Sequence, residues 1–280
     1  MKPVPGKRSR KLHPMVRILI IAACTYLGMI IVMAVFQRRL QYFPFGGVPL
    51  VPSGGAYRGL EEVEVVAKDG PKLRGWYWPG TMPVAVYVLH GNAGNRAHRL
   101  YWLARIHSMG ATVFILDYRG FGGSEGSPTE DGLYLDAEAG ARWLAARSAG
   151  KIVYFGESLG SAVAVELALR APPAGMVLQA GFPSATDVAR RAYPFLPVGL
   201  LLRDRFEAAE RIGRVTCPIL FIHGDRDSIV PFELGRALHD AAVAPKEWFA
   251  VSGADHNDIP DVGGAAYFER IGEFLRRVSG

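Results

Sequence analysis

A serine between two glycines, near the middle of the chain, has the setting of a catalytic nucleophile. Residues 156–160 read Gly-Glu-Ser-Leu-Gly and follow the apolar run Ile-Val-Tyr-Phe at residues 152–155. Where a strand turns sharply into a helix, a serine at the tip exposes its hydroxyl, and glycines two positions away avoid collision with the neighbouring strand and helix. Ser158 is therefore the candidate nucleophile, but so short a pattern also arises by chance and needs partners elsewhere in the chain.

The partners that a serine nucleophile requires are a base and a carboxylate that orients the base. In chains of alternating strands and helices they follow the serine in the order Asp or Glu, then His. Two aspartates come after the predicted strand 219–222, and Asp227 is preferred over Asp225 because it precedes the Ile-Val-Pro that begins the next helix. His256 alone among the histidines follows both aspartates and the last predicted strand, which makes it the candidate base.

Attack on an acyl carbonyl also requires hydrogen-bond donors for the oxyanion that forms. The backbone N–H of Leu159, directly after the nucleophile, is the first candidate donor. The second is expected in the loop His-Gly-Asn-Ala-Gly-Asn at residues 90–95, which follows a predicted strand. Its glycines keep side chains away from a substrate carbonyl, so the N–H of Asn92 is the preferred donor, with Ala93 the alternative if the turn differs.

Other kinds of site lack the residues that they require. The loop at residues 90–95 has no Gly-Lys-Ser/Thr and does not predict a phosphate-binding loop. Residues 120–126 miss a dinucleotide fingerprint because Glu125 stands where its third glycine belongs. No Cys and His cluster has metal-ligand spacing, so neither a metal nor a cofactor is expected. Cys24 lies in an apolar stretch and Cys217 precedes a strand, which argues against a disulfide between them.

Buried strands alternating with helical stretches are expected to position these residues. Such alternation predicts an α/β fold with a mostly parallel central sheet and helices on both faces. Chemistry in these folds collects at the carboxyl ends of the strands, which is where Ser158 falls. A short antiparallel hairpin is expected first, at residues 63–66 and 73–78. The parallel strands are expected at residues 84–89, 112–116, 152–155, 176–179, 219–222 and 247–251, and the helices at residues 97–109, 130–147, 158–170, 231–242 and 265–277.

The alternation stops between residues 181 and 215. Residues 193–202 within this stretch are apolar and contain two prolines. One interpretation is ordinary packing over the edge of the sheet. The other is a lid at about residues 182–215 that covers the site and faces a membrane.

The N-terminal part of the chain has a different character. Residues 18–36 contain no charge, and a helix of that length spans about 28 Å, close to the hydrocarbon thickness of a bilayer. This predicts a transmembrane signal anchor at residues 18–36, after a basic tail at 1–17 and before a connector at 37–57 and a catalytic domain at 58–280. A cleaved signal peptide is the alternative, but the apolar run is long for one and ends without a small-x-small site.

Charge around the apolar run predicts its orientation. Six Lys and Arg precede the run and two follow it, so the positive-inside rule places the N-terminus in the cytoplasm and the catalytic domain on the outer side. The rest of the chain contains the other 24 Lys and Arg and all 26 Asp and Glu, which gives it a net charge of −2. The net charge of +6 therefore reflects membrane topology, and no nucleic-acid partner is expected.

Several of these runs together resemble the α/β-hydrolase superfamily. They are residues 90–95, residues 116–122 (Leu-Asp-Tyr-Arg-Gly-Phe-Gly), residues 156–160 and the segments around Asp227 and His256. Within the superfamily the chain is similar to the membrane-anchored α/β-hydrolase-domain group, related to serine aminopeptidases and monoglyceride lipases, and the junction after the anchor shares this likeness. The resemblance covers nearly the whole chain and implies serine hydrolase activity on an ester, a thioester or an amide.

The apolar lid and the anchor together favour an acyl ester or thioester, a small or lipid-like molecule reached at a membrane surface. A serine peptidase is the alternative function. It requires an acidic group near the site to hold a substrate amine, for which Glu125 and Glu157 are the candidates. A hydrolase-fold protein that has lost catalysis and serves as a membrane interaction partner is less favoured, because all three triad residues are present. The oligomeric state is not predicted.

Overall fold

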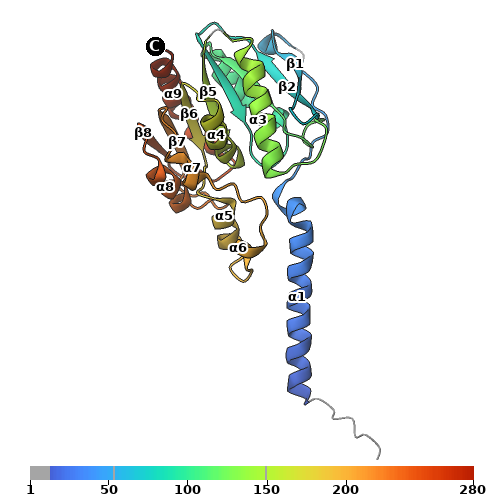
Figure 1. Ribbon diagram of the computed structural model, residues 1–280. Helices are drawn as coiled ribbons and strands as arrows, with labels where there is room; N and C mark the ends of the chain where they lie inside the picture. The colour runs from blue at the N-terminus through green and yellow to red at the C-terminus, as the bar shows by residue number, and fades with distance from the viewer. Residues whose placement is uncertain (1–12, 53, 149) are drawn as a thin grey trace, which may run out of the picture. The chain divides into compact units, whose positions relative to one another are not determined.

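The computed structural model describes residues 13–52, 54–148 and 150–280. The chain divides into two units, one that ends at Gln37 and one that comprises Arg38–Gly280. Helix α1 (Pro14–Gln41) makes up the described part of the first unit apart from His13, and its last four residues belong to the second unit. The second unit contains the central sheet and the remaining helices (Figure 1).

Helix α1 is longer than the predicted span of residues 18–36. It begins at Pro14 and continues to Gln41, so the first five residues of the predicted connector are helical. The sequence prediction ended the span at the first charge, but arginine, leucine and glutamine are good helix formers and extend the helix beyond it. The helix is long and apolar enough to cross a membrane, although a signal sequence near an N-terminus has the same properties.

One mixed sheet forms the centre of the second unit, and its described strands run in the order β1-β2-β4-β3-β5-β6-β7-β8. The first two strands form the predicted antiparallel hairpin, and β2 also pairs antiparallel with β4. All pairings from β4 to β8 are parallel, which confirms the predicted mostly parallel sheet. The strands are β1 (Glu61–Val66), β2 (Lys72–Trp78), β3 (Val84–Leu89), β4 (Thr112–Leu116), β5 (Lys151–Glu157), β6 (Gly175–Gln179), β7 (Ile219–Gly224) and β8 (Lys246–Val251).

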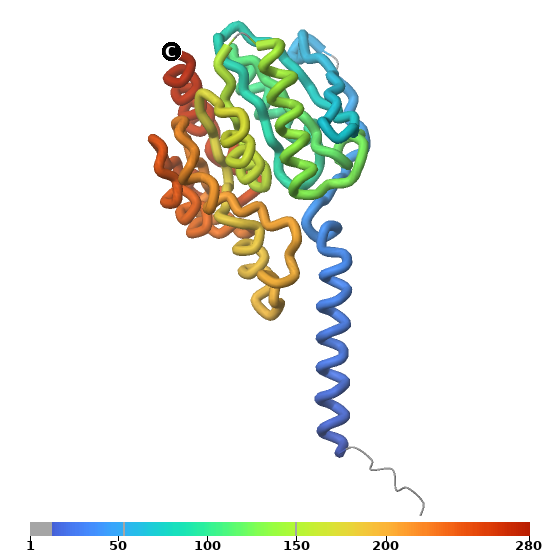
Figure 2. Tube along the Cα trace, in the orientation of Figure 1, coloured from blue at the N-terminus to red at the C-terminus, as the bar shows by residue number. Residues whose placement is uncertain are grey.

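Helices cover both faces of this sheet. Helices α3, α4, α7 and α8 contribute to one apolar cluster, and α2 and α9 contribute to the other. Figures 1 and 2 show α3 and α4 side by side over one face. Strand β3 is buried throughout and alternates between the clusters, because successive side chains of a strand point to opposite faces. The helices of this unit are η1 (Gly55–Tyr57), η2 (Arg96–Arg99), α2 (Leu100–Ser108), α3 (Glu130–Ala145), α4 (Leu159–Arg170), α5 (Ala185–Ala192), α6 (Val198–Leu201), α7 (Ala208–Ile212), α8 (Phe232–Ala241) and α9 (Ile259–Ser279).

Two predicted helices differ from the structure at their N-terminal ends. The helix expected at residues 97–109 is divided into the 3₁₀ turn η2 and helix α2. The helix expected at residues 265–277 is part of α9, which begins at Ile259 and is kinked at Gly264, where φ is 51° and ψ is −134°. Glycine adopts this backbone conformation without the penalty that other residues incur. The stretch at residues 182–215 folds into the short helices α5, α6 and α7.

Candidate active site

The turn from β5 into α4 holds Ser158 in a sparsely populated backbone conformation, with φ 52° and ψ −115°. Such a conformation costs about 1–3 kcal/mol for a residue with a side chain and persists only where the surroundings impose it. Here the Ser158 N–H donates to the carbonyl of Gln179 on β6 (2.8 Å). The Ser161 hydroxyl lies within hydrogen-bonding distance of that carbonyl and of the Gly156 carbonyl, so both sides of the turn are fixed.

The glycines on either side of Ser158 are required by close backbone contacts. A Cβ on Gly160 would lie 1.9 Å from the carbonyl oxygen of Leu89 at the end of β3. A Cβ on Gly156 would lie 2.6 Å from the carbonyl oxygen of Gly160 in α4. The prediction that larger residues here would collide with the neighbouring strand and helix is confirmed.

The three candidate triad residues meet at the carboxyl edge of the sheet, although they come from three separate loops. The Ser158 Oγ lies 3.0 Å from the His256 Nε2, and the His256 Nδ1 lies 2.7 Å from the Asp227 Oδ2. A carboxylate only accepts, so these partners assign the proton to Nδ1 and leave Nε2 to accept from the serine hydroxyl. This geometry suits transfer of the serine proton to the imidazole.

Asp227 is held as a buried, fully bonded carboxylate. Its Oδ1 accepts from the N–H groups of Ile229 (3.0 Å) and Val230 (2.7 Å), and its Oδ2 faces His256 and, at 3.4 Å, the Nε2 of His223. Burial alone would raise the pKa of Asp227, but the hydrogen bonds from the two histidines outweigh it and hold the pKa well below the usual range. The carboxylate therefore stays ionised at neutral pH.

The other aspartate considered in the sequence, Asp225, has a different environment. Its carboxylate accepts from the Ser252 hydroxyl (3.0 Å) and the Gly253 N–H (2.6 Å), so it stabilises the turn after β8. Asp255, which the sequence analysis did not single out, joins the two catalytic loops. Its Oδ1 accepts from the N–H groups of Ser228 and His256, both at 2.7 Å.

The loop at residues 90–95 is held from its inner side by His90. The Nδ1 of this fully buried histidine donates to the Gly91 carbonyl (2.7 Å). In the trans peptide between Gly91 and Asn92, the Asn92 N–H points away from that carbonyl. Burial lowers the pKa of His90 to about 4, so the ring is neutral and its hydrogen bond fixes the direction of the Asn92 N–H.

The two candidate oxyanion donors differ in how they are supported. Leu159 begins α4, and the first N–H groups of a helix have no intrahelical acceptor. Asn92 has its carbonyl and its side-chain amide engaged: the carbonyl accepts from the Phe43 N–H and the amide donates to the Gln41 carbonyl, both at 2.8 Å. Its backbone N–H is the group that remains as the candidate donor to a substrate oxygen.

A partly buried ion pair that the sequence analysis missed joins the nucleophile turn to this loop. The Arg99 guanidinium donates two hydrogen bonds to the Glu157 carboxylate (2.8 and 2.9 Å) and one to the Ala93 carbonyl (2.7 Å). Burial would raise the pKa of Glu157, but the charge and hydrogen bonds of Arg99 lower it below its usual value. No local pattern pointed to this pair, because its members are 58 residues apart.

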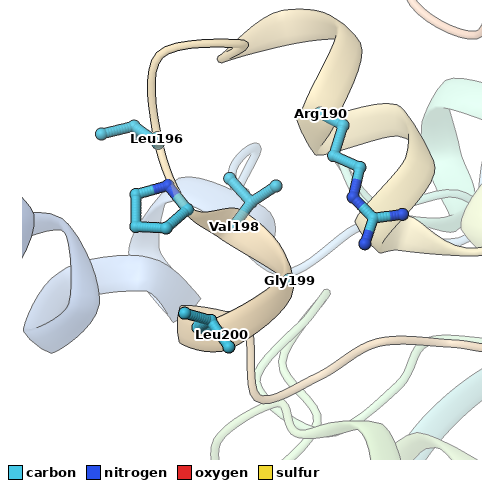
Figure 3. Close-up of a pocket in the computed structure, with 6 residues that line it drawn as sticks. Arg190, Leu196, Val198, Gly199 and Leu200 are labelled. Carbon is cyan, nitrogen blue, oxygen red and sulfur yellow. The ribbon is translucent and has the colours of Figure 1, made fainter.

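The predicted lid at residues 182–215 presents apolar side chains at its surface. Figure 3 shows Leu196, Val198 and Leu200 around an open groove between α5 and α6, with Arg190 on the opposite side. The groove has a volume of about 350 Å³. Leu196 and Val198 are buried, but Tyr193, Phe195 and Leu200 are exposed, so this segment has apolar side chains outside the core. Among the residues that the structure describes, no group of three His, Cys, Asp or Glu side chains is arranged to hold a metal ion.

Comparison with known proteins identifies the family. A family model described as the alpha/beta hydrolase fold matches residues 84–211, from β3 into α7. Over 275 residues the chain is 42% identical to an uncharacterised protein of Mycobacterium tuberculosis, a match that covers 96% of each chain. The chain belongs to the α/β-hydrolase superfamily. The resemblance and the fold class predicted from the sequence are thereby confirmed.

Relatives of this α/β-hydrolase include enzymes. It is 35% identical over 207 residues to the lysophosphatidylserine lipase of Danio rerio, and this match covers 65% of the present chain and 53% of the lipase. Its fold matches the structure of an esterase of Pyrococcus furiosus with a TM-score of 0.72 and 23% identity, covering 86% of this chain and 98% of the esterase. The family and the lipase relative support hydrolase activity, and the match to the esterase supports the fold.

Proposed function

We propose that the protein is a membrane-anchored serine hydrolase that cleaves an acyl ester or thioester through an acyl-enzyme. The observation that carries this proposal is the continuous set of contacts from the Ser158 hydroxyl through His256 to Asp227. The buried and ionised state of Asp227 adds to it, because an orienting carboxylate must remain charged to stabilise the imidazolium.

In the proposed mechanism Ser158 attacks the acyl carbon while His256 takes the hydroxyl proton at Nε2. The tetrahedral oxyanion accepts from the N–H groups of Leu159 and Asn92, and the resulting imidazolium is stabilised by Asp227. His256 then gives the proton to the departing alcohol or thiol, which leaves an acyl ester on Ser158. A water molecule attacks this ester while His256 takes a proton from the water at Nε2. The second tetrahedral intermediate then collapses, His256 returns the proton to the Ser158 oxygen, and the carboxylic acid is released from the regenerated enzyme.

Ester or thioester substrates are favoured over peptides by the state of the acidic residues. Glu157, one candidate for holding a substrate amine, is bound at both carboxylate oxygens by Arg99. Glu125, the other candidate, accepts from the N–H of Lys72. The apolar face of the lid segment and the lipase among the relatives are consistent with a lipid-like acyl group.

Membrane anchoring is the second part of the proposal. Helix α1 has the length and composition of a span, and the positive charge lies mainly before it. We propose that the N-terminus is cytoplasmic and that the hydrolase domain lies on the outer side of the membrane.

Fluorophosphonate labelling of the full chain tests the nucleophile. Wild type and Ser108→Ala, which changes an exposed serine on α2, are expected to label, whereas Ser158→Ala is expected not to. Equal labelling of Ser158→Ala would exclude Ser158 as the nucleophile. A series of p-nitrophenyl esters then tests the substrate class: the proposal predicts higher kcat/KM for octanoyl than for acetyl, and a strong preference for acetyl contradicts the lipid-like acyl group. Faster turnover of aminoacyl p-nitroanilides than of the esters would favour the peptidase.

A further inference from the structure

The residues that directly follow the uncharged part of α1 contact both the candidate oxyanion loop and the lid segment. We call residues 38–45 the strap. All of them belong to the second unit, and the first four form the end of α1. The proposed mechanism assigns no role to the strap, yet one of its residues touches Asn92 and Asp204 at the same time.

At the lid segment, three strap residues converge on Asp204. Arg38 donates from Nε (2.9 Å) and Nη2 (3.2 Å) to the two carboxylate oxygens, and the Tyr42 hydroxyl donates to Oδ2 (3.1 Å). Gln41 donates from its side chain to the Asp204 backbone carbonyl (2.9 Å). The Asp204 side chain is only 6% exposed, so these donors supply the hydrogen bonds that water would otherwise provide. Hydrogen bonds to charged groups are among the stronger ones in proteins.

At the oxyanion loop, Phe43 of the strap pairs with the backbone on both sides of Ala93. The Phe43 N–H donates to the Asn92 carbonyl (2.8 Å), and the Gly94 N–H donates to the Phe43 carbonyl (3.0 Å). The side-chain amide of Asn92 donates to the Gln41 carbonyl (2.8 Å). Gln41 therefore binds Asn92 through its backbone and Asp204 through its side chain.

Together with His90, these strap contacts determine the orientation of the Asn92 N–H. His90 fixes the peptide plane that carries this N–H, and the strap fixes the side chain and the carbonyl that follow it. An oxyanion donor contributes only when it already points at the position of the developing charge, because reorientation during the reaction costs free energy. A misplacement of about 1 Å can reduce a rate by about 100-fold.

We propose that the strap is a positioning element of the active site, which orients the Asn92 N–H and couples the oxyanion loop to the lid segment through Gln41. The proposal rests on the function proposed above. It means that the end of the anchor helix is a structural part of the catalytic site in addition to its role in attachment.

Two variants of the full chain in detergent micelles test this proposal. Asn92→Asp keeps the backbone N–H and the side-chain shape but replaces the donor facing the Gln41 carbonyl by a carboxylate oxygen. Gln41→Met removes the hydrogen bond to Asp204 and keeps the backbone carbonyl, which makes it the milder change. Asp240→Asn is the control, because it exchanges a carboxylate and an amide in an exposed ion pair on α8, outside the strap and the oxyanion loop.

Asn92→Asp is expected to lower kcat by about 10- to 1,000-fold with KM nearly unchanged. The upper limit of this range corresponds to the complete loss of one oxyanion donor. Gln41→Met is expected to lower kcat by about 10-fold or less. A trifluoromethyl ketone forms an adduct with Ser158 that carries an oxyanion, so its affinity for both variants should fall in proportion to kcat/KM. The control Asp240→Asn should match wild type in kcat, KM and ketone affinity. Melting temperatures show which variants fold.

Wild-type kcat and ketone affinity in both Asn92→Asp and Gln41→Met, when these fold, would overturn the positioning role. A rise in KM with kcat unchanged would also overturn it, because the strap would then act on substrate binding. These outcomes differ from a failure of the proposed function, which would appear as absence of fluorophosphonate labelling in the wild-type protein itself.

Discussion

Asp225 and Asp227 lie two residues apart on one loop but have different partners. Asp225 accepts from the turn at Ser252 and Gly253, whereas Asp227 is buried and contacts the ring of His256. The backbone donors at Ile229 and Val230 fix the Asp227 carboxylate so that one oxygen remains directed at the histidine. The chemical role therefore follows from the partners of each carboxylate and not from its residue type.

Replacing each aspartate by asparagine tests this difference. Asp227→Asn is expected to lower kcat on the order of 10⁴-fold with little change in KM, because an amide no longer fixes the His256 tautomer or stabilises the imidazolium. Asp225→Asn is expected to keep kcat close to that of wild type and to lower only the melting temperature. Steady-state kinetics with a p-nitrophenyl ester measure both, and equal losses in the two variants would contradict the assignment of Asp227.

The sequence could predict the triad candidates because their order along the chain follows from the order of the strands. Ser158, Asp227 and His256 each follow a predicted strand, and a parallel sheet brings such positions to one edge. The pair of Arg99 and Glu157 could not be predicted in this way. It joins residues that are 58 positions apart and has no periodic or local pattern.

At the scale of elements, the approach of α4 to β3 determines how Ser158 is presented. The carbonyl of Leu89 occupies the place of a side chain at position 160, so helix and strand pack backbone to backbone. Gly213, after α7, has no such neighbour, since a Cβ there would meet only the Ala241 carbonyl oxygen at 3.6 Å. The two glycines thus offer a matched comparison between a close packing contact and an open helix end.

Alanine at these two positions should give opposite results. Gly160→Ala is expected to lower the free energy of unfolding by about 3 kcal/mol or more, because the collision is with backbone atoms that have little room to move. Gly213→Ala is expected to stay within about 1 kcal/mol of wild type, on the stabilising side, because its backbone is already helical and alanine restricts the unfolded chain. Urea unfolding of the full chain in micelles, followed by tryptophan fluorescence, measures both. A Gly160→Ala protein as stable as wild type would contradict the packing argument, and failure to fold would be visible as lost yield.

Strand positions were predictable because buried apolar runs bounded by glycine, proline and charge have few alternative structures. Strands β3 and β4 match their predictions, and the other parallel strands differ by at most two residues at either end. The end of α1 did not follow from the predicted span, because charged residues end a membrane span without ending a helix. The sequence does not indicate the strap either, because residues 37–57 predict a connector and the partner Asp204 is 166 residues from Arg38.

At the scale of the whole molecule, charge is separated along the sequence. The basic residues before and after the apolar run account for the excess positive charge, and the remaining chain is close to neutral. Under the topology proposed from the positive-inside rule, the tail stays in the cytoplasm and the hydrolase domain crosses the membrane. A signal sequence that is cleaved would instead remove the tail from the mature protein.

Cysteine labelling of the full chain distinguishes these topologies. In a background with Cys24→Ser and Cys217→Ser, a cysteine at Val243, which is 80% exposed before β8, reports on the hydrolase domain, and one at Ser9 reports on the tail. In spheroplasts of a bacterial host, a membrane-impermeant maleimide is expected to label Val243→Cys without lysis and Ser9→Cys only after lysis. The reverse pattern would place the domain in the cytoplasm and contradict the charge argument. Loss of the Ser9→Cys signal from the mature chain, together with a shorter protein, would show that the apolar helix is a cleaved signal sequence and that the proposed anchor is wrong.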